Sequence, residues 1–358
     1  RQRQMCIRDS ADVDSQKQSD HLVKSVVLTD LIIHYNAGKS KLIINFTVYF
    51  RGALWYNCPQ KGMRPVMLCN LCPRHCGVDR DVSQGYCMSP NIIKLARAAL
   101  HFWEEPCISG TKGSGTVFFC GCNLRCVYCQ NSEISGGGAG IPMSDEDVMR
   151  TFDRLIEKGA HNLNLVTPTH YADSVARILE KYHSPVPIVY NCGGYEFVET
   201  LKMLEGLVDI YLPDFKYADA ALAAEYSHAP DYFERASEAI KEMNRQVGVL
   251  KLDSDGIAER GLIIRHLVLP GAVSNTKKVL RWIKENLPEG TVVSLMSQYT
   301  PCAKAAEHPP LDRRISKYEY EIALDAMIDL GFDNGYVQSR RSAQKDFIPD
   351  FQSHEGLL

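Results

Sequence analysis

The chain has 358 residues, of which 45% are hydrophobic and 23% are charged, as is ordinary for a globular protein that buries a large core. One barrel-sized domain or two smaller ones would fit this length. The formal net charge of -3 provides no general basic field, so neither nucleic acid nor an anionic membrane is an expected partner.

Residues 1–62 differ from the rest, with a polar opening and no sustained periodicity, and we expect a non-native or disordered extension there. The opening Arg1–Ser10 resembles translated sequencing-adaptor sequence, and Met63 is the expected start of the native chain. Beyond it we predict a cysteine-rich N-terminal segment over 63–110, a core over 111–340 and a C-terminal tail over 341–358.

The chain contains thirteen cysteines, most of them in short ligand-like spacings. The odd number and the spacings favour a reducing, cytoplasmic compartment over a disulfide framework. No apolar run reaches the roughly 18 residues of a membrane-spanning helix. The opening residues also lack the apolar region of a signal peptide.

Four of these cysteines lie within nineteen positions of the N-terminal segment, at Cys69, Cys72, Cys76 and Cys87. Their thiolates would complete a tetrahedral site for zinc or hold a second iron–sulfur cluster. Four ligands leave no open position, which favours a structural or electron-relay role. Reduced structural thiols are the alternative, and the spacing does not choose between the metals.

From Thr116 onward, short β-branched runs alternate with amphipathic stretches about six times. The predicted strands are Thr116–Cys120, Asn162–Val166, Pro187–Tyr190, Asp209–Leu212, Leu262–Leu269 and Val292–Met296. The predicted helices are Ser144–Lys158, Tyr171–Tyr182, Phe197–Leu204, Ser274–Asn286 and Lys317–Leu330. This alternation predicts an α/β fold with a parallel sheet, either a complete or partial barrel or a doubly wound sheet. Active-site residues are then expected at the carboxyl ends of the strands.

Directly after the first predicted strand comes Cys122-x3-Cys126-x2-Cys129. Three thiolates would bind three irons of a four-iron cluster and leave the fourth without an obvious protein ligand. A cluster used purely for electron transfer normally has four cysteine ligands, so the vacancy indicates chemistry at the iron. A zinc site or buried reduced thiols are the alternatives. Cys120 is a competing ligand that would lose the spacing, and we expect it to pack as a small apolar side chain.

This spacing, with Tyr128 just before the last cysteine, resembles the signature of the radical S-adenosylmethionine (SAM) superfamily. The stretch Leu95–Ser135 is similar to pyruvate formate-lyase activating enzyme-like proteins, and the resemblance covers roughly Met67 to Phe351. It implies a partial parallel (β/α)6-type barrel over 111–340, with the cysteine-rich segment before it.

The resemblance also implies the cofactors and the reaction. A 4Fe–4S cluster bound by Cys122, Cys126 and Cys129 would cleave SAM reductively to a 5′-deoxyadenosyl radical, which abstracts a hydrogen atom from substrate. A low-potential electron donor of the flavodoxin or ferredoxin type is an implied partner. A glycyl residue of a partner enzyme is one conceivable substrate, and another protein, a peptide or a small molecule are others. The alternative function, from a different class, is that of an iron–sulfur or zinc protein with an electron-transfer or structural role.

The resemblance further implies three contacts to SAM. Tyr128 is expected against the adenine, and Asn191 and Arg265 are expected to make polar contacts to ribose and carboxylate. Structural hydrogen bonds or ion pairs are the alternative roles of these two polar residues.

Other polar residues after the predicted strands are open to two interpretations. Activating enzymes often carry Gly-Gly-Glu after the second strand, where this chain has Thr167-Pro168-Thr169-His170. The polar side chains there suit either cofactor contacts or a turn before the next helix. Asp214 and Lys216 suit either a substrate site or an ion pair.

Overall fold

The structure is a computed structural model that describes residues 68–138, 140–338 and 350–357, and the backbone of five earlier strands. The chain divides into two compact units, Arg1–Leu68 and Cys69–Leu358. In the first unit the strands pair in sequential order as an antiparallel sheet: β1 (Leu22–Leu28), β2 (Leu31–Ala37), β3 (Thr47–Phe50), β4 (Ala53–Cys58) and β5 (Gly62–Val66). The other residues in 1–62, on which the predicted disordered or non-native extension falls, lie outside the described part of the chain. The predicted domain boundaries stay predictions.

The second unit, called the barrel unit here, is built on one sheet with the strand order β15-β14-β13-β11-β10-β9-β7-β6-β8. Neighbouring strands on the path from β15 to β7 in this order run parallel. They are β7 (Ser114–Phe119), β9 (Leu163–Val166), β10 (Ile188–Cys192), β11 (Ile210–Pro213), β13 (Ala258–Leu267), β14 (Val292–Met296) and β15 (Gly335–Val337). Each of the six predicted strands overlaps one of these. The sheet does not close on itself, since β15 and β8 are its two edges, and the predicted partial barrel is confirmed.

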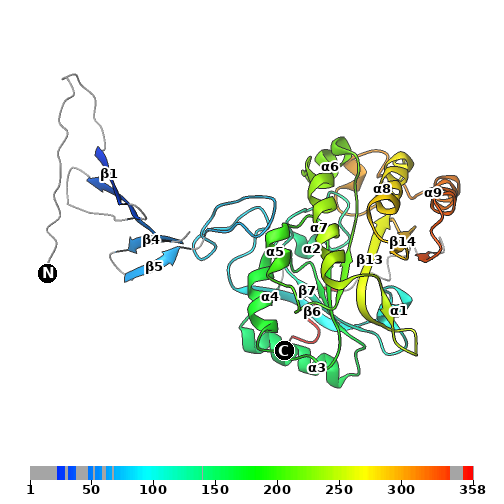
Figure 1. The fold of residues 1–358 in the computed structure, drawn as a ribbon, viewed down its shortest axis with the longest axis horizontal. Coiled ribbons are helices and arrows are strands. Elements are labelled where there is room, and N and C mark those ends of the chain that lie inside the picture. The colour runs from blue at the N-terminus through cyan, green and yellow to red at the C-terminus, as the bar shows by residue number, and fades with distance from the viewer. Residues whose placement is uncertain are drawn as a thin grey trace. The chain divides into compact units, whose positions relative to one another are not determined.

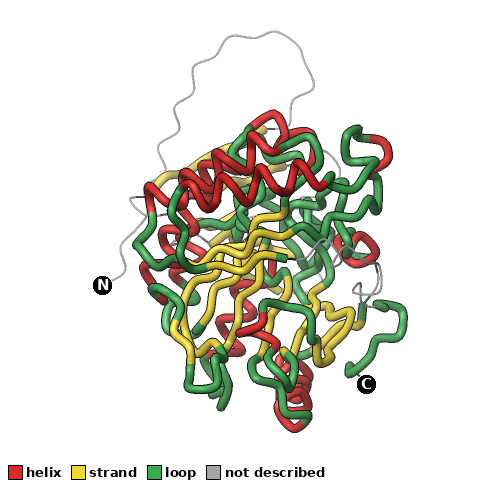
Figure 2. The backbone as a smooth tube through the Cα atoms, turned by 90° about the vertical axis from the view of Figure 1, so that its right-hand side faces the viewer, coloured by secondary structure: helices red, strands yellow, loops and turns green. Residues whose placement is uncertain are grey.

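Helices connect the parallel strands and lie around the sheet (Figures 1 and 2). They are α3 (Asp145–Glu157), α4 (Ala172–Leu179), α5 (Val198–Lys202), α6 (Ala220–Ser227), α7 (Tyr232–Val247), α8 (Val273–Asn286) and α9 (Lys317–Asp329). Because helices cover the sheet, strands such as β10 are buried along their whole length. α3 begins as predicted: Ser144 Oγ accepts from the Asp147 amide at 3.1 Å, and the Asp147 carboxylate accepts from the Ser144 amide at 3.1 Å.

Several elements were not predicted from the sequence. β6 (Ile93–His101) and β8 (Ile141–Met143) extend one edge of the sheet in the antiparallel sense, and β12 (Lys251–Leu252) pairs with β13. The short helices α1 (Pro106–Ser109) and α2 (Ser132–Ser135) lie in loops. α6 and α7 are also additional, although α7 is the longest described helix. One face of α7 is buried at Tyr232, Ala236, Ala239, Ile240, Met243 and Val247, a helical spacing.

Part of the predicted C-terminal tail belongs to the barrel unit. The described residues 350–357 run beside β6, where the Ala98 amide donates to the Glu355 carbonyl at 2.9 Å. Phe351 packs edge-on against Phe118, with ring centroids 5.2 Å apart. Residues 341–349 and 358 lie outside the described residues. In the described part of the chain, no helix has the length and apolar character needed to cross a membrane.

Candidate active site

A cavity of about 360 Å³ opens at the carboxyl ends of the parallel strands, where the fold predicts an active site. Its walls include the loops or last residues of the parallel strands β7, β9, β10, β11, β13 and β14, and residues that directly follow β6 and β15 also contribute. The polar and sulfur-bearing lining residues from those positions include Cys122, Cys126, Tyr128, Cys129, Thr167, Asn191, Asp214, Lys216, Arg265 and Gln298. The three cysteines and the three predicted SAM contacts thus line one cavity.

The cysteine loop follows β7 through a turn that only glycine allows. Gly121 has φ +91°, and a side chain there would meet Ser89 Oγ at 1.9 Å and the Cys87 carbonyl oxygen at 2.6 Å. Beyond this turn, Cys122 Sγ accepts a hydrogen bond from the Leu124 amide at 3.3 Å. Buried β7 and the glycine turn together place the loop at the cavity.

The loop offers three thiols, a donor set that suits an iron–sulfur cluster. Burial, with a contribution from Cys126, raises the pKa of the Cys122 thiol to about 11, and the same two causes raise the pKa of Cys129. These two thiols are therefore neutral without metal, and binding iron releases their protons. Among the described residues, no three His, Cys, Asp or Glu side chains converge as ligands of a single ion. In a four-iron cluster each thiolate binds a different iron, so its ligands stand farther apart.

Cys120 does not line the cavity. It is buried in a small apolar cluster with Ala96, Phe118, Ile134, Val166 and Phe351. Burial raises the pKa of its thiol to about 11. The expectation that Cys120 packs as a small apolar side chain is confirmed.

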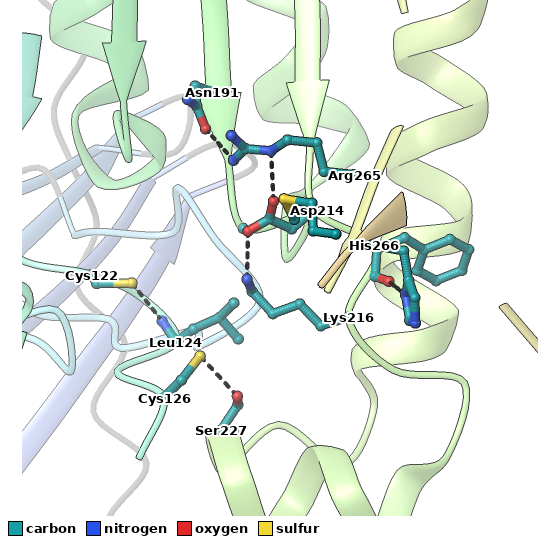
Figure 3. Close-up of polar contacts among 12 residues, drawn as sticks. Cys122, Leu124, Cys126, Asn191, Asp214, Lys216, Ser227, Arg265 and His266 are labelled. Carbon is teal, nitrogen blue, oxygen red and sulfur yellow. Dashed lines mark hydrogen bonds and ion pairs between the residues drawn. The ribbon is translucent and has the colours of Figure 1, made fainter. Parts of the chain in front are cut away.

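A network of charged side chains forms the opposite wall of the cavity (Figure 3). Arg265 donates through Nε to Asp214 at 2.9 Å, through Nη1 to Glu104 at 3.0 Å and through Nη2 to Asn191 at 2.7 Å. Lys216 pairs with the other oxygen of Asp214. The alternative interpretation of Asp214 and Lys216 as an ion pair is confirmed, and both also face the cavity.

The network keeps the Asp214 carboxylate charged despite burial. Burial alone would raise the pKa of Asp214, but Arg265 and Lys216 outweigh burial and lower it. The same balance raises the pKa of Lys216, where Asp214 outweighs burial. Because two cations meet two carboxylates, this wall is close to neutral. All three donor groups of the Arg265 fork have partners within the protein.

Tyr128 is held by aromatic neighbours. Its ring lies edge-on to Tyr226 and Tyr299, with centroids 6.3 and 6.0 Å away. Its hydroxyl bonds to that of Tyr217 at 2.7 Å. The ring therefore has a fixed orientation beside the cysteines.

The residues after β9 have largely structural roles. Thr169 Oγ1 donates to Glu196 at 2.6 Å, and His170 Nε2 bonds to the Cys120 carbonyl at 2.7 Å. Both side chains are buried, and burial lowers the pKa of His170 to about 3. They lie in a 3₁₀ turn, Thr169–Tyr171, that precedes α4. Thr167 alone of the three polar side chains lines the cavity.

None of the four upstream cysteines lines the cavity. Cys72 and Cys87 are buried, and burial raises the pKa of Cys72 to about 12. Cys76 Sγ accepts a hydrogen bond from the Tyr86 amide at 3.2 Å. None of the four forms a disulfide. The upstream cysteines thus lie outside the cavity lining, and the described residues include no three of them placed to bind a single ion.

Arg74, which the sequence did not single out, joins the upstream segment to the cysteine loop. Its Nε donates to the Asn123 carbonyl at 2.6 Å, and its Nη2 donates to the Ser227 carbonyl at 2.8 Å. Its Nη1 donates to the carbonyl of His228. The guanidinium carbon lies 3.9 Å from the ring centroid of Tyr86. No local signal marks Arg74, because its partners lie 49 to 154 positions away.

Comparison with known proteins gives the same class of protein. The family model described as "Radical SAM superfamily" matches residues 116–251. The chain is 31% identical over 267 residues to the uncharacterized protein MJ0674 of Methanocaldococcus jannaschii, a match that covers 72% of this chain and 73% of that protein.

Two solved structures are similar at a lower level. SuiB of Streptococcus suis bound to S-adenosylmethionine is 14% identical, with a TM-score of 0.40 and coverage of 61% of this chain and 48% of that chain. A domain of pyruvate-formate lyase-activating enzyme from Bacteroides vulgatus ATCC 8482 is 13% identical, with a TM-score of 0.33 and coverage of 48% of this chain and 91% of that chain. The chain thus spans about half the length of SuiB, and these low scores do not bear on its function.

A mostly parallel α/β sheet with a three-cysteine loop after its first parallel strand defines a class of iron–sulfur enzymes. The chain belongs to the radical SAM superfamily, as the match to its archaeal relative and the family model over the cysteine loop show. It is accordingly an enzyme of the class that uses a 4Fe–4S cluster and SAM. The resemblance inferred from the cysteine spacing is confirmed.

Proposed function

We propose that Cys122, Cys126 and Cys129 hold the 4Fe–4S cluster and that SAM occupies the adjoining cavity. The observation that carries this proposal is the common lining: all three cysteines border the same 360 Å³ cavity at the carboxyl ends of the strands. When bound, the cluster and SAM would supply the reductive cleavage and a 5′-deoxyadenosyl radical that abstracts a hydrogen atom from substrate.

The residues of the chain would bind and orient SAM. Tyr128 offers a fixed aromatic face next to the cysteines, which suits an adenine ring. Asn191 lies on the wall where a ribose contact is expected. Arg265 stays a predicted contact to the SAM carboxylate. To bind it, Arg265 would release Glu104 or Asp214, its present partners.

The cavity would also limit the access of water to the reaction. Its wall combines the nearly neutral charge network with apolar side chains, including Phe118, Val166 and Leu267. A dry site keeps a reactive species from side reactions. The substrate class remains a proposal from resemblance: a glycyl residue of a partner enzyme, with reduction by a flavodoxin or ferredoxin.

The reaction is tested by reconstituting the protein with iron and sulfide and measuring 5′-deoxyadenosine after reduction with dithionite in the presence of SAM. We expect the parent to form it and Cys126→Ala to form none. Cys120→Ala is the matched control, because Cys120 is a buried neighbour outside the cavity lining. A Cys126→Ala protein as active as the parent would overturn the assignment.

The alternative function is an iron–sulfur or zinc protein that serves electron transfer or structure without SAM. In that case the parent would take up metal and form no 5′-deoxyadenosine. A fluorescent or radiolabelled SAM analogue would also bind no better than background.

We further propose that Cys69, Cys72, Cys76 and Cys87 hold a second metal centre, either zinc or a second iron–sulfur cluster. The support is their close spacing in the chain, together with three structural facts: two are buried, none is in a disulfide, and a backbone amide donates to the Cys76 sulfur. The iron and zinc content of the purified protein tests this. Four irons per chain without zinc would leave these cysteines as reduced structural thiols.

A further inference from the structure

We propose that Ser227 is a positioning residue that raises the reduction potential of the cluster by donating a hydrogen bond to the sulfur of Cys126. This inference rests on the proposed function, because it requires Cys126 to bind iron. Ser227 Oγ lies 3.0 Å from Cys126 Sγ, a direct contact that Figure 3 shows. Ser227 comes from the end of α6, about one hundred residues beyond the cysteine loop, and does not line the cavity.

The hydrogen bond stands at the end of a chain of three hydroxyls. Tyr217 bonds to Ser227 Oγ at 2.8 Å, and Tyr128 bonds to the Tyr217 hydroxyl at 2.7 Å. Ser227 and Tyr217 are fully buried, and Tyr128 is 6% exposed. Water therefore does not compete for these groups.

The direction of this chain follows from counting protons. An iron-bound thiolate has no proton, so it can only accept, and Ser227 must spend its single hydroxyl proton on the sulfur. Tyr217 must then donate to Ser227, and Tyr128 must donate to Tyr217. All three O–H dipoles point toward Cys126, and hydrogen bonds aligned in this way strengthen one another.

The position of the Ser227 hydroxyl is fixed by the upstream segment. α6 ends at Ser227, and His228 takes a left-handed conformation with φ 50°. Arg74 binds the carbonyls of both residues, and its Nε also binds the Asn123 carbonyl of the cysteine loop. One guanidinium thus holds the hydrogen-bond donor and the loop that contains its acceptor.

The physical effect of such a bond has a definite sign. Reduction adds negative charge to the cluster and its thiolates, so a donor aimed at a sulfur stabilises the reduced state more than the oxidised state. Hydrogen bonds to sulfur are among the factors that set cluster potentials. In a buried site the effect is larger than in water. Removing the Ser227 hydroxyl should therefore lower the midpoint potential and make the cluster harder to reduce.

The test is an anaerobic redox titration of the reconstituted protein without SAM, followed by the paramagnetic resonance signal of the reduced cluster. We expect Ser227→Ala to lower the midpoint potential and Tyr217→Phe to lower it by less, since Tyr217→Phe keeps the Ser227 donor. Ser227→Thr, which keeps a hydroxyl, should restore the parent value. Ser237→Ala on α7 is the matched control, because the Ser237 hydroxyl is buried and has no hydrogen-bond partner.

Iron and sulfide content separates the two proposals. A parent protein that takes up no cluster at Cys126 would overturn the proposed function itself. A parent and a Ser227→Ala protein with equal cluster content and equal potentials would overturn only the role of Ser227. If Ser227→Ala loses the cluster, Tyr217→Phe decides the question: a lowered potential supports the inference, and an unchanged one contradicts it.

Discussion

Two regions of this chain have the same kind of side chain and different surroundings: the loop Cys122–Cys129 and the segment Cys69–Cys87. The loop follows the first parallel strand and borders the cavity, while no upstream cysteine does. The loop offers three thiols and the segment offers four. The position of each group relative to the cavity therefore distinguishes them. The loop is expected to leave one iron free to bind SAM, and the segment is expected to hold a metal with no free coordination position.

The two regions are nevertheless joined. Arg74 stands between Cys72 and Cys76 in the chain. It donates to carbonyls of the cysteine loop and of the end of α6, the two segments that the Ser227–Cys126 hydrogen bond joins. The Tyr86 hydroxyl also donates to the Leu124 carbonyl at 3.3 Å. The upstream segment thus holds the cysteine loop through hydrogen bonds. Changes at Arg74 or Tyr86 should therefore alter the properties of the cluster.

The largest expected effect distinguishes the two groups of cysteines. Cys129→Ala should abolish the cluster that responds to SAM, because two thiolates do not hold the four irons. Cys76→Ala should keep that cluster and lose only metal that belongs to the upstream group. Iron analysis and visible absorption before and after adding SAM measure both. If Cys76→Ala also loses the SAM-responsive cluster, the two groups do not act separately.

The next effect concerns the charge network on the catalytic side. Arg265→Gln removes the shared partner of Asp214 and Glu104, which are only 19% and 12% exposed, and such a loss costs up to about 3–5 kcal/mol of unfolding free energy. Asp214 has a lowered pKa, so its contribution is present above the ordinary aspartate pKa and is lost as the pH falls through the lowered value. The difference between parent and variant should therefore shrink in acid.

Urea unfolding at pH 7 and in acid measures this difference. Arg245→Gln is the control, since Arg245 also pairs with two glutamates but is 52% exposed, and exposed pairs contribute about 0–1 kcal/mol. Equal losses from the two variants at pH 7 would contradict the role given to burial.

A smaller effect should come from Arg74 on the upstream side. Arg74→Ala leaves three carbonyls without a charged donor, and we expect a loss of about 2–3 kcal/mol in unfolding free energy. It should also lower the cluster potential, because the donor Ser227 is no longer held. Arg150→Ala is the surface control, with a side chain that is 67% exposed. A stable Arg74→Ala protein with the parent potential would show that the two regions are independent.

The last effect is a slope of stability with pH rather than a loss at one pH, and it arises at the buried Glu196. Burial raises the pKa of this carboxyl to about 8, although hydrogen bonds from Thr169 and other neighbours oppose the rise. The folded chain then binds a proton that the unfolded chain has released, so stability falls as the pH rises from about 4.5 to about 8. One group contributes at most about 1.4 kcal/mol per pH unit.

Glu196→Gln should flatten this slope, as measured by urea unfolding at several pH values between 5 and 8. Glu199→Gln, three positions on and exposed, should keep the parent slope. Identical slopes in the parent and in Glu196→Gln would mean that the buried carboxyl is ionised throughout.

Patterns within short stretches of the sequence predicted the parallel strands and several of the helices. Buried β-branched runs predicted the six strands, and Ser144 with Asp147 predicted a capped helix. The periodicity of α7 was also available, since Tyr232, Ala236 and Met243 lie on one helical face. The helix was not predicted, although the parallel strands expected on either side of residues 213–261 require a crossover connection.

The candidate site was predictable only where its residues follow one another in the chain. The cysteine spacing is such a case. Glu104, Arg74 and Ser227 were missed because their roles depend on partners far away in sequence: Glu104 reaches Arg265 across 161 positions, and Ser227 reaches Cys126 across 101. Charged and hydroxyl side chains of this kind are common on surfaces, so their type alone does not reveal a buried function.

One measurement tests the central claim most directly: the paramagnetic resonance spectrum of the reduced, reconstituted protein with and without SAM. If the three cysteines leave one iron open beside the cavity, SAM should change the spectrum of the parent and of Cys76→Ala alike. A reduced cluster whose spectrum is the same with and without SAM would contradict the claim that this cavity brings SAM to the cluster.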